Sequence, residues 1–243
     1  DRKHLSSVHV QLLSLATSLP PHSVAQDEAK ALGRLLFAGR KALYDRLSGV
    51  FDNAGIANRA LVAPLDWYAG DHGWQSRNDL YLRASEALFA EAAANAIGKA
   101  GLLPGDIDGV VTVSTTGIAT PSLEARAGPA LGLSDKASRV PIFGLGCAGG
   151  VSGLATAARL AAAQPGSRWL FVCVETCSIS IRLDSDDPAA LVATALFGDG
   201  AAAAVVEAAD GGRASITAAG ERLWPDTLGI MGWRVEDPGF AVV

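Results

Sequence analysis

The spacing of hydrophobic positions changes several times along the chain, between the alternation typical of strands and the three- and four-residue spacing typical of helices. Residues 107–114 alternate and predict a strand, whereas residues 79–99 are rich in Ala, Leu and Glu, end before Gly101 and predict the longest helix. Other predicted helices are 41–53, 122–131, 148–163 and 188–197, and other predicted strands are 5–19, 139–143, 169–174, 201–206, 214–219 and 239–243. This order predicts an α/β fold with a mainly parallel sheet covered by helices on both faces.

Two segments near the start of the chain have weaker patterns. Ser23 and Gln26 have the spacing of a capping box and predict that a helix begins at Ser23. After the helix at 41–53 comes a segment with Gly, Pro and aromatic residues that has no clear period. We expect this segment to be a loop that covers a site.

Composition narrows the class of protein. The chain has 243 residues, 49% of them hydrophobic, which suffices for one large domain or two small ones. A net charge of -5 argues against nucleic-acid binding. Three cysteines make no disulfide framework, and the four histidines do not combine with them into a zinc pattern, so we expect no metal and a reducing, cytoplasmic compartment. No apolar run reaches the roughly 18 residues of a membrane span.

The ends of the chain and one internal break suggest its organisation. The chain starts at Asp1 rather than Met and ends in an apolar strand pattern, which would leave an unpaired sheet edge, so we expect the protein to continue. A polar break at 209–212 separates two predicted domains, 1–210 and 211–243.

Cys147 is the candidate nucleophile. It lies between a predicted apolar strand and an Ala-rich helix, in a turn with Gly144, Gly146, Gly149 and Gly150. Glycines allow a sharp turn and a close approach by a ligand. The helix dipole and free N–H groups at a helix start favour a thiolate, and the same N–H groups can stabilise an oxyanion. This pattern predicts attack on a thioester carbonyl.

Two other interpretations of this turn remain open on the residues alone. Most unpaired cysteines are small buried hydrophobic residues. Gly144, Gly146 and Gly149 also match a dinucleotide-binding fingerprint, with Glu175 as the acid that would hold a ribose. Against this, Glu175 lies 31 residues beyond Gly144, where about 20 is usual, and we expect the strand before the turn to be an interior strand of the sheet.

A set of separated motifs carries a family resemblance over essentially the whole chain. The motifs are Ser114-Thr115-Thr116-Gly117 with Pro121-Ser122, Gly146-Cys147-Ala148-Gly149-Gly150, Val172-Cys173-Val174-Glu175, Ala195-Leu196-Phe197-Gly198-Asp199-Gly200-Ala201-Ala202, and Met231-Gly232-Trp233 with Asp237-Pro238-Gly239-Phe240. In these motifs the chain resembles the N-terminal two-thirds of a bacterial type III polyketide synthase, the chalcone synthase-like branch of the thiolase-fold condensing enzymes. The resemblance implies a thiolase-like αβαβα layered fold, consisting of the N-terminal repeat and the first strands of the second repeat.

The resemblance also implies an activity and a set of site residues. A starter acyl group is loaded from coenzyme A onto Cys147 and extended by decarboxylative condensation with malonyl-CoA. Coenzyme A thioesters are substrates, no separate cofactor is implied, and the enzyme would be a homodimer. Phe197 matches the aromatic gatekeeper of the coenzyme A tunnel, and Arg46 lies near a position that contacts the coenzyme A phosphates. The positions that match the cavity lining are Thr115, Thr116, Glu175, Cys177, Ser180 and Ala193.

The chain departs from the family pattern in one respect. Such synthases use a downstream His and Asn to bind the thioester carbonyl and promote decarboxylation, and the four histidines here, His4, His9, His22 and His72, all lie upstream. The alternatives are a condensing enzyme similar to ketoacyl synthase III or hydroxymethylglutaryl-CoA synthase, or a non-catalytic half-module that dimerises with a complete synthase.

Overall fold

The computed structural model describes residues 9–182, 187–209 and 214–243. The chain forms two compact units, each of which is described by itself. The first unit takes its residues from Asp1–Ser18, Ser85–Glu175 and Ala201–Leu223, and the second from Leu19–Ala84, Thr176–Gly200 and Trp224–Val243. The expected domain boundary between residues 210 and 211 lies outside the described residues.

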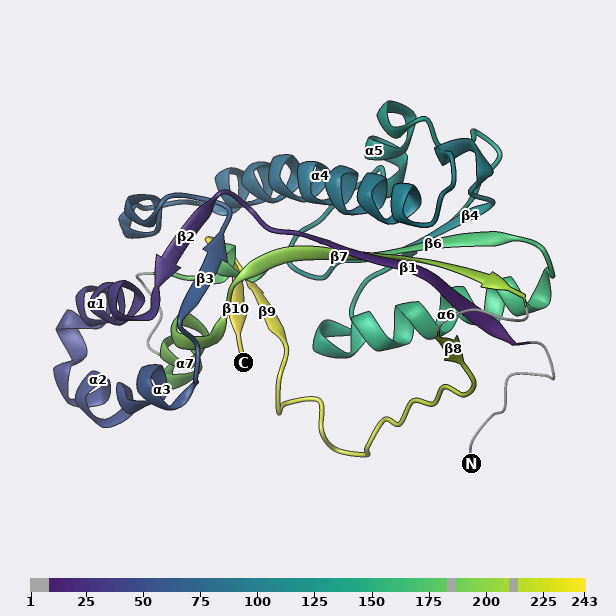
Figure 1. Cartoon of the computed structure of the whole chain (residues 1–243). Coiled ribbons are helices and arrows are strands. Elements are labelled where there is room, and N and C mark those ends of the chain that lie inside the picture. Colours follow the sequence, from purple (N-terminus) through teal and green to yellow (C-terminus); the bar gives the residue numbers. More distant parts are fainter. Residues whose placement is uncertain (1–8, 183–186, 210–213) are drawn as a thin grey trace. The chain divides into compact units, whose positions relative to one another are not determined.

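A six-stranded sheet organises the first unit (Figure 1). Its order is β5-β4-β6-β7-β1-β8. The strands are β1 (Val10–Ser18), β4 (Gly109–Val113), β5 (Ser138–Ile142), β6 (Arg168–Thr176), β7 (Asp199–Ala208) and β8 (Ser215–Ile216). Strand β4 pairs in parallel with β5 and β6, but β1 is antiparallel to β7 and β8. The sheet is therefore mixed, and the prediction of a mainly parallel sheet was wrong for its β7-β1-β8 side.

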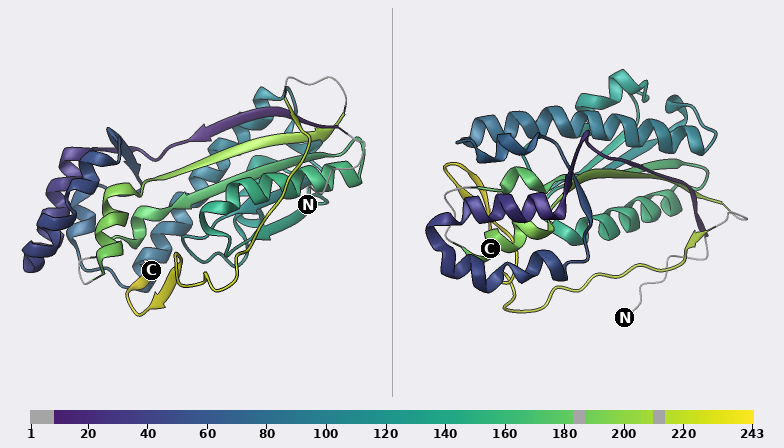
Figure 2. Two further views of the ribbon diagram at one scale, coloured as in Figure 1. Left: turned by 90° about the horizontal axis from the view of Figure 1, so that it is seen from below. Right: turned by 60° about the vertical axis from the view of Figure 1, so that its left-hand side comes forward.

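Helices cover both faces of this sheet, as predicted. The second half of α4 (Trp74–Lys99) lies on one face and α6 (Gly149–Ala163) on the other, as Figures 1 and 2 show. Helix α5 (Leu123–Leu131) packs beside β4 and β5. In the core between α6 and the sheet, Ala157, Ala158 and Ala161 of the helix belong to the same hydrophobic cluster as Val111 and Trp169 of the strands. Small alanines allow helix and sheet to approach closely, which explains why the helix is rich in Ala.

The second unit packs short helices around a small core. Helices α1 (Gln26–Leu36), α2 (Lys41–Leu47) and α3 (Gly49–Asn53) pack against α7 (Pro188–Leu196), beside the antiparallel pair β2 (His22–Ala25) and β3 (Asn58–Leu61). The short 3-10 helices η2 (Leu65–Ala69) and η5 (Cys177–Ser180) belong to this unit. Its core includes Phe51, Tyr68 and Leu191, each at most 2% exposed.

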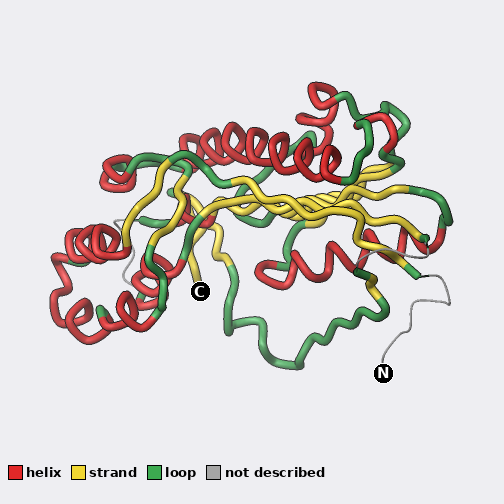
Figure 3. Tube along the Cα trace, viewed as in Figure 1, coloured by secondary structure: helices red, strands yellow, loops and turns green. Residues whose placement is uncertain are grey.

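An aromatic hairpin closes the described chain. Strands β9 (Trp233–Glu236) and β10 (Gly239–Val242) pair antiparallel, and the rings of Trp233 and Phe240 stack with centroids 5.7 Å apart. Residues 217–232, which precede the hairpin, form a long segment without a regular helix or strand (Figure 3). The predicted strand at 214–219 is correspondingly reduced to the two residues of β8.

Local predictions in the second unit needed three corrections. The first helix begins at Gln26, because Ser23 belongs to β2 and pairs with Ala60, and the Ala25 N–H donates to the Glu28 carboxylate. The helix predicted at 41–53 is two helices, α2 and α3. The segment predicted as a loop contains β3 and η2.

Among the described residues, no helix is both long and apolar enough to cross a membrane. The alternating pattern at 107–114 and the Ala-rich pattern at 148–163 produced the strand and helix expected of them, within two residues at either end.

Candidate active site

Cys147 lies at the junction of β5 and α6, in the short 3-10 helix η4 (Gly146–Ala148). Its side chain is an exposed free thiol. The interpretation of Cys147 as a small buried hydrophobic residue was therefore wrong. The strand before the turn, β5, is an edge strand, so the expectation of an interior strand was also wrong.

The glycines of the turn have distinct roles. Gly144 and Gly146 have φ values of 92° and 53°, which residues with a side chain rarely adopt. Gly149 has an ordinary φ, but a Cβ atom there would lie 2.5 Å from Val113 Cγ1. Its hydrogen lets the start of α6 lie directly against β4. Cys147 is thus placed by a sharp turn on one side and a close helix–strand contact on the other.

The backbone N–H groups next to Cys147 are already used. Ala148 N–H donates to Leu145 O at 3.2 Å, and Gly149 N–H donates to Gly146 O. These two donors stabilise the turn itself. The expectation that N–H groups at the helix start stabilise an oxyanion is therefore not met by Ala148 or Gly149.

Thr115, Thr116 and Glu175, which were predicted to line a cavity, form a hydrogen-bonded group. Glu175 accepts from the Thr115 N–H at 3.0 Å and from the Thr115 hydroxyl at 2.9 Å, and Thr116 also donates to it. Burial raises the pKa of Glu175, and these hydrogen bonds act in the opposite direction. Burial, helped by the charge of Glu175, raises the pKa of the neighbouring Cys173 thiol to about 12, so this cysteine is not a nucleophile at neutral pH.

The sheet topology places this group and Cys147 at one edge. Val113 of β4 is level with Ile142 of β5 and with Cys173 of β6, and the strands are parallel. The segments that follow Val113 and Ile142 therefore leave the sheet at the same carboxyl edge, where ligands bind in α/β sheets, and the last residues of β6, up to Thr176, extend past this level. The two segments carry Thr115, Thr116 and Cys147, and the end of β6 carries Glu175. The carboxyl ends of three strands thus supply an exposed thiol and a polar group.

The remaining predicted site residues lie in the second unit. Cys177 and Ser180 begin and end η5, where the Ser180 hydroxyl donates to Cys177 O at 2.7 Å. Ala193 is buried within α7, and Phe197 is the half-buried residue that ends this helix. Arg46 is exposed on α2.

Sequence reasoning missed a buried polar network beside Phe197. Asp199 is 6% exposed and accepts from the N–H groups of Val62 and Ser178, both at 2.8 Å, and from the Ser178 hydroxyl. The Tyr68 hydroxyl lies 2.6 Å from Ser178 Oγ. Burial raises the pKa of Asp199 to about 6, against the effect of these hydrogen bonds and of the Arg59 charge. A signal was present in the sequence, since Asp199 lies two residues before the apolar run at 201–206.

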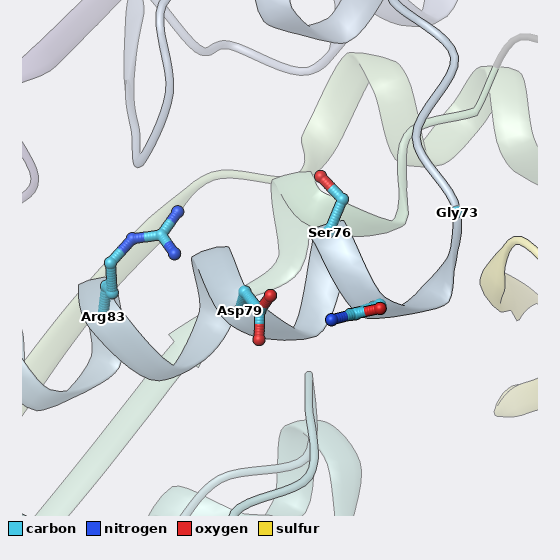
Figure 4. Close-up of a pocket in the computed structure, with 5 residues that line it drawn as sticks. Gly73, Ser76, Asp79 and Arg83 are labelled. Carbon is cyan, nitrogen blue, oxygen red and sulfur yellow. The ribbon is translucent and has the colours of Figure 1, made fainter.

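The beginning of α4 carries an open hollow of about 440 Å³ (Figure 4). Its lining is Gly73, Gln75, Ser76, Asp79 and Arg83, none of which was predicted as a site residue. Across the described residues, no group of three or more His, Cys, Asp and Glu side chains could hold a metal ion.

Comparisons with known proteins agree with one another. Residues 67–210 match the family model of chalcone and stilbene synthases, N-terminal domain. The chain is 39% identical to 1,3,6,8-tetrahydroxynaphthalene synthase of Streptomyces peucetius subsp. caesius, over 93% of this chain and 61% of that protein. It is 37% identical to a putative chalcone synthase of Bacillus subtilis (strain 168), over 96% of this chain and 67% of that protein.

A solved structure extends this likeness to the fold. The crystal structure of 1,3,6,8-tetrahydroxynaphthalene synthase from Streptomyces coelicolor A3(2), a bacterial type III polyketide synthase, superposes with a TM-score of 0.86 and 29% identity. The superposition covers 96% of this chain and 67% of that one. It confirms the predicted thiolase-like α/β fold. The chain spans about three-fifths to two-thirds of the length of these relatives.

Proposed function

Because this chain belongs to the family of chalcone and stilbene synthases, we propose that Cys147 carries an acyl group as a thioester in a type III polyketide synthase. The observation that carries the proposal is the exposed thiol of Cys147 at the carboxyl edge that β4, β5 and β6 share. A starter acyl group comes from an acyl-CoA, and malonyl-CoA supplies the extension units. Coenzyme A thioesters are the substrates, and no further cofactor takes part.

The proposed reaction has a loading step and a condensation step. The Cys147 thiolate attacks the carbonyl carbon of the starter thioester, the bond to the coenzyme A sulfur breaks, and coenzyme A leaves as a thiolate that takes a proton from water. Malonyl-CoA then loses carbon dioxide, and the resulting enolate attacks the acyl carbon on Cys147. A carbon–carbon bond forms and the Cys147 thiolate is released for the next cycle.

The surroundings of Cys147 suit an acyl group. Phe143, Leu145 and Val151 are 60%, 38% and 74% exposed, and all lie within four residues of Cys147 in the sequence. Exposed apolar side chains of this kind favour a hydrocarbon ligand over a charged one.

The finer assignments belong to the same proposal. Phe197 acts as the aromatic gatekeeper, Arg46 contacts the coenzyme A phosphates, and Cys177, Ser180 and Ala193 line the cavity together with Thr115, Thr116 and Glu175. The protein acts as a homodimer. It works in the cytoplasm, which is consistent with three cysteines that form no disulfide.

The condensation step needs further residues besides the cysteine that carries the acyl group. The family supplies a downstream His and Asn for decarboxylation, and this sequence has no His after His72. The ring of His72 stacks on Trp67 with centroids 4.0 Å apart, and its Nε2 lies 2.9 Å from Trp67 O. We therefore expect this chain alone to form the acyl-Cys147 thioester without releasing a polyketide.

Intact-mass spectrometry after incubation with hexanoyl-CoA tests the proposal. One hexanoyl group should be added to the wild-type chain and to Cys173→Ala, and none to Cys147→Ala. Subsequent malonyl-CoA should give a pyrone or resorcinol product only when the region with the family's His and Asn is present. If Cys147 stays unmodified even with that region restored, the non-catalytic half-module is the correct interpretation.

A further inference from the structure

The carboxyl end of α7 is held by a buried arginine. Arg59 on β3 is 8% exposed, and its Nη1 donates to Thr194 O at 2.6 Å and to Phe197 O at 2.8 Å. Carbonyl groups at the end of a helix lack intrahelical partners and carry the negative end of the dipole. The guanidinium group therefore caps α7, and one of its two acceptors is the carbonyl of Phe197 itself.

A second anchor follows two residues later. The Asp199 carboxylate accepts from the Val62 N–H at 2.8 Å, and Val62 directly follows β3, the strand that carries Arg59. The same carboxylate accepts from the backbone and side chain of Ser178. Phe197 thus stands between two side-chain anchors that both connect it to the β3 segment.

The ring of Phe197 has a contact of its own. It lies edge-on to Trp233, with centroids 6.2 Å apart and planes at 76°. The backbone N–H of Phe197 donates to Ala193 O at 2.8 Å, so its N–H, its carbonyl and its ring all have defined partners. Such a residue has little freedom to move without breaking a buried polar contact.

We propose that Arg59 and Asp199 are positioning residues that hold Phe197 in place and thereby limit the length of the acyl group that the protein accepts. This inference rests on the proposed function, because it takes Phe197 as the gatekeeper for loading Cys147. Neither Arg59 nor Asp199 takes part in the chemical step. They affect the selectivity for acyl length by fixing the position of Phe197.

The decisive experiment compares loading of Cys147 by dodecanoyl-CoA and by hexanoyl-CoA, with rates measured by intact mass on the same chain. Arg59→Lys keeps the positive charge but replaces the planar guanidinium with a point-like ammonium. We expect the dodecanoyl-to-hexanoyl rate ratio to rise at least about threefold, because small displacements of a residue that orders a substrate change rates strongly.

Two further variants make the readout specific. Ser178→Ala removes one donor to Asp199 without removing a charge, and should shift the ratio in the same direction even if Arg59→Lys fails to fold. Tyr44→Phe removes a hydrogen bond to Lys30 O elsewhere in the same core, without contact to Phe197, and should leave the ratio unchanged.

A double-mutant cycle separates positioning from general destabilisation. In a Phe197→Ala background, Arg59→Lys should no longer change the ratio. A ratio that is unchanged in both single variants, or that shifts equally with and without Phe197, overturns the inference while leaving the proposed function intact. A wild-type chain that takes up neither acyl group overturns both.

Discussion

Glu175 accepts hydrogen bonds from both the backbone N–H and the hydroxyl group of Thr115. The two residues lie 60 positions apart in the sequence, at the ends of the neighbouring parallel strands β4 and β6. The carboxylate thus fixes the loop after β4 at the edge that also carries Cys147.

Replacement of the Thr115 hydroxyl should weaken this connection. Thr115→Val keeps the shape of the side chain but removes one donor to the buried carboxylate, and we expect it to lower the free energy of unfolding by about 1–2 kcal/mol. Thr115→Ser keeps the hydroxyl and should lose less. Urea denaturation of the three proteins measures the difference, and a larger loss for Ser than for Val would show that the methyl group, not the hydrogen bond, matters.

The two glycines at the start of α6 should respond differently to alanine. In Gly149→Ala the new Cβ would meet Val113, a fully buried β-branched residue, at 2.5 Å, so we expect a loss of about 1–3 kcal/mol. In Gly150→Ala the Cβ would meet nothing within 4 Å, and the better helix propensity of Ala should raise stability by up to about 1 kcal/mol. Thermal unfolding of both variants tests this, and similar shifts would contradict the described contact.

Cys147 and Cys173 should differ in reactivity. At pH 8 the exposed Cys147 should react with iodoacetamide at least about 100 times faster than Cys173, because burial raises the pKa of Cys173 to about 12 and leaves little thiolate. Peptide mass mapping over time identifies the modified residue. Rapid labelling that persists at Cys173 in Cys147→Ser would show that this thiol is accessible and ionised.

Asp199 should make the stability of the protein depend on pH. Its pKa is raised from 3.8 to about 6 by burial, while the facing groups Arg59, Ser178 and Val62 favour the carboxylate and the Tyr68 hydroxyl lies behind Ser178. Between about pH 4 and 6 the folded protein therefore binds more protons here than the unfolded chain does. This contribution to stability is fully present at low pH and is lost as the pH rises through about 6.

The matched comparison is with Asp199→Asn, which does not titrate. The free energy of unfolding of the wild type relative to this variant should fall by up to about 3 kcal/mol between pH 4 and pH 7. Urea denaturation at several pH values measures this difference in the free energy of unfolding. The titration of Glu175 does not affect the difference, because both proteins contain this residue. A difference that grows with pH would mean that the hydrogen bonds favour the carboxylate more than burial disfavours it.

Two of the predictions that failed share a cause. The residues Asn58-Arg59-Ala60-Leu61 show no alternation, yet they form β3 because β2 offers them backbone partners. The same pairing draws Ser23 into an extended strand and moves the start of α1 to Gln26. Pairing between distant segments overrode local preference at both places.

The sequence by itself determined the strand, turn and helix around Cys147, because alternation, glycine spacing and an Ala-rich pattern act over a few residues. Together with the separated motifs, it also indicated the family. The tertiary structure was needed to show that Thr115 and Glu175 meet, that Arg59 donates to the Phe197 carbonyl, and that Asp199 accepts from the Val62 N–H. These contacts depend on strand order and burial, which no local pattern encodes.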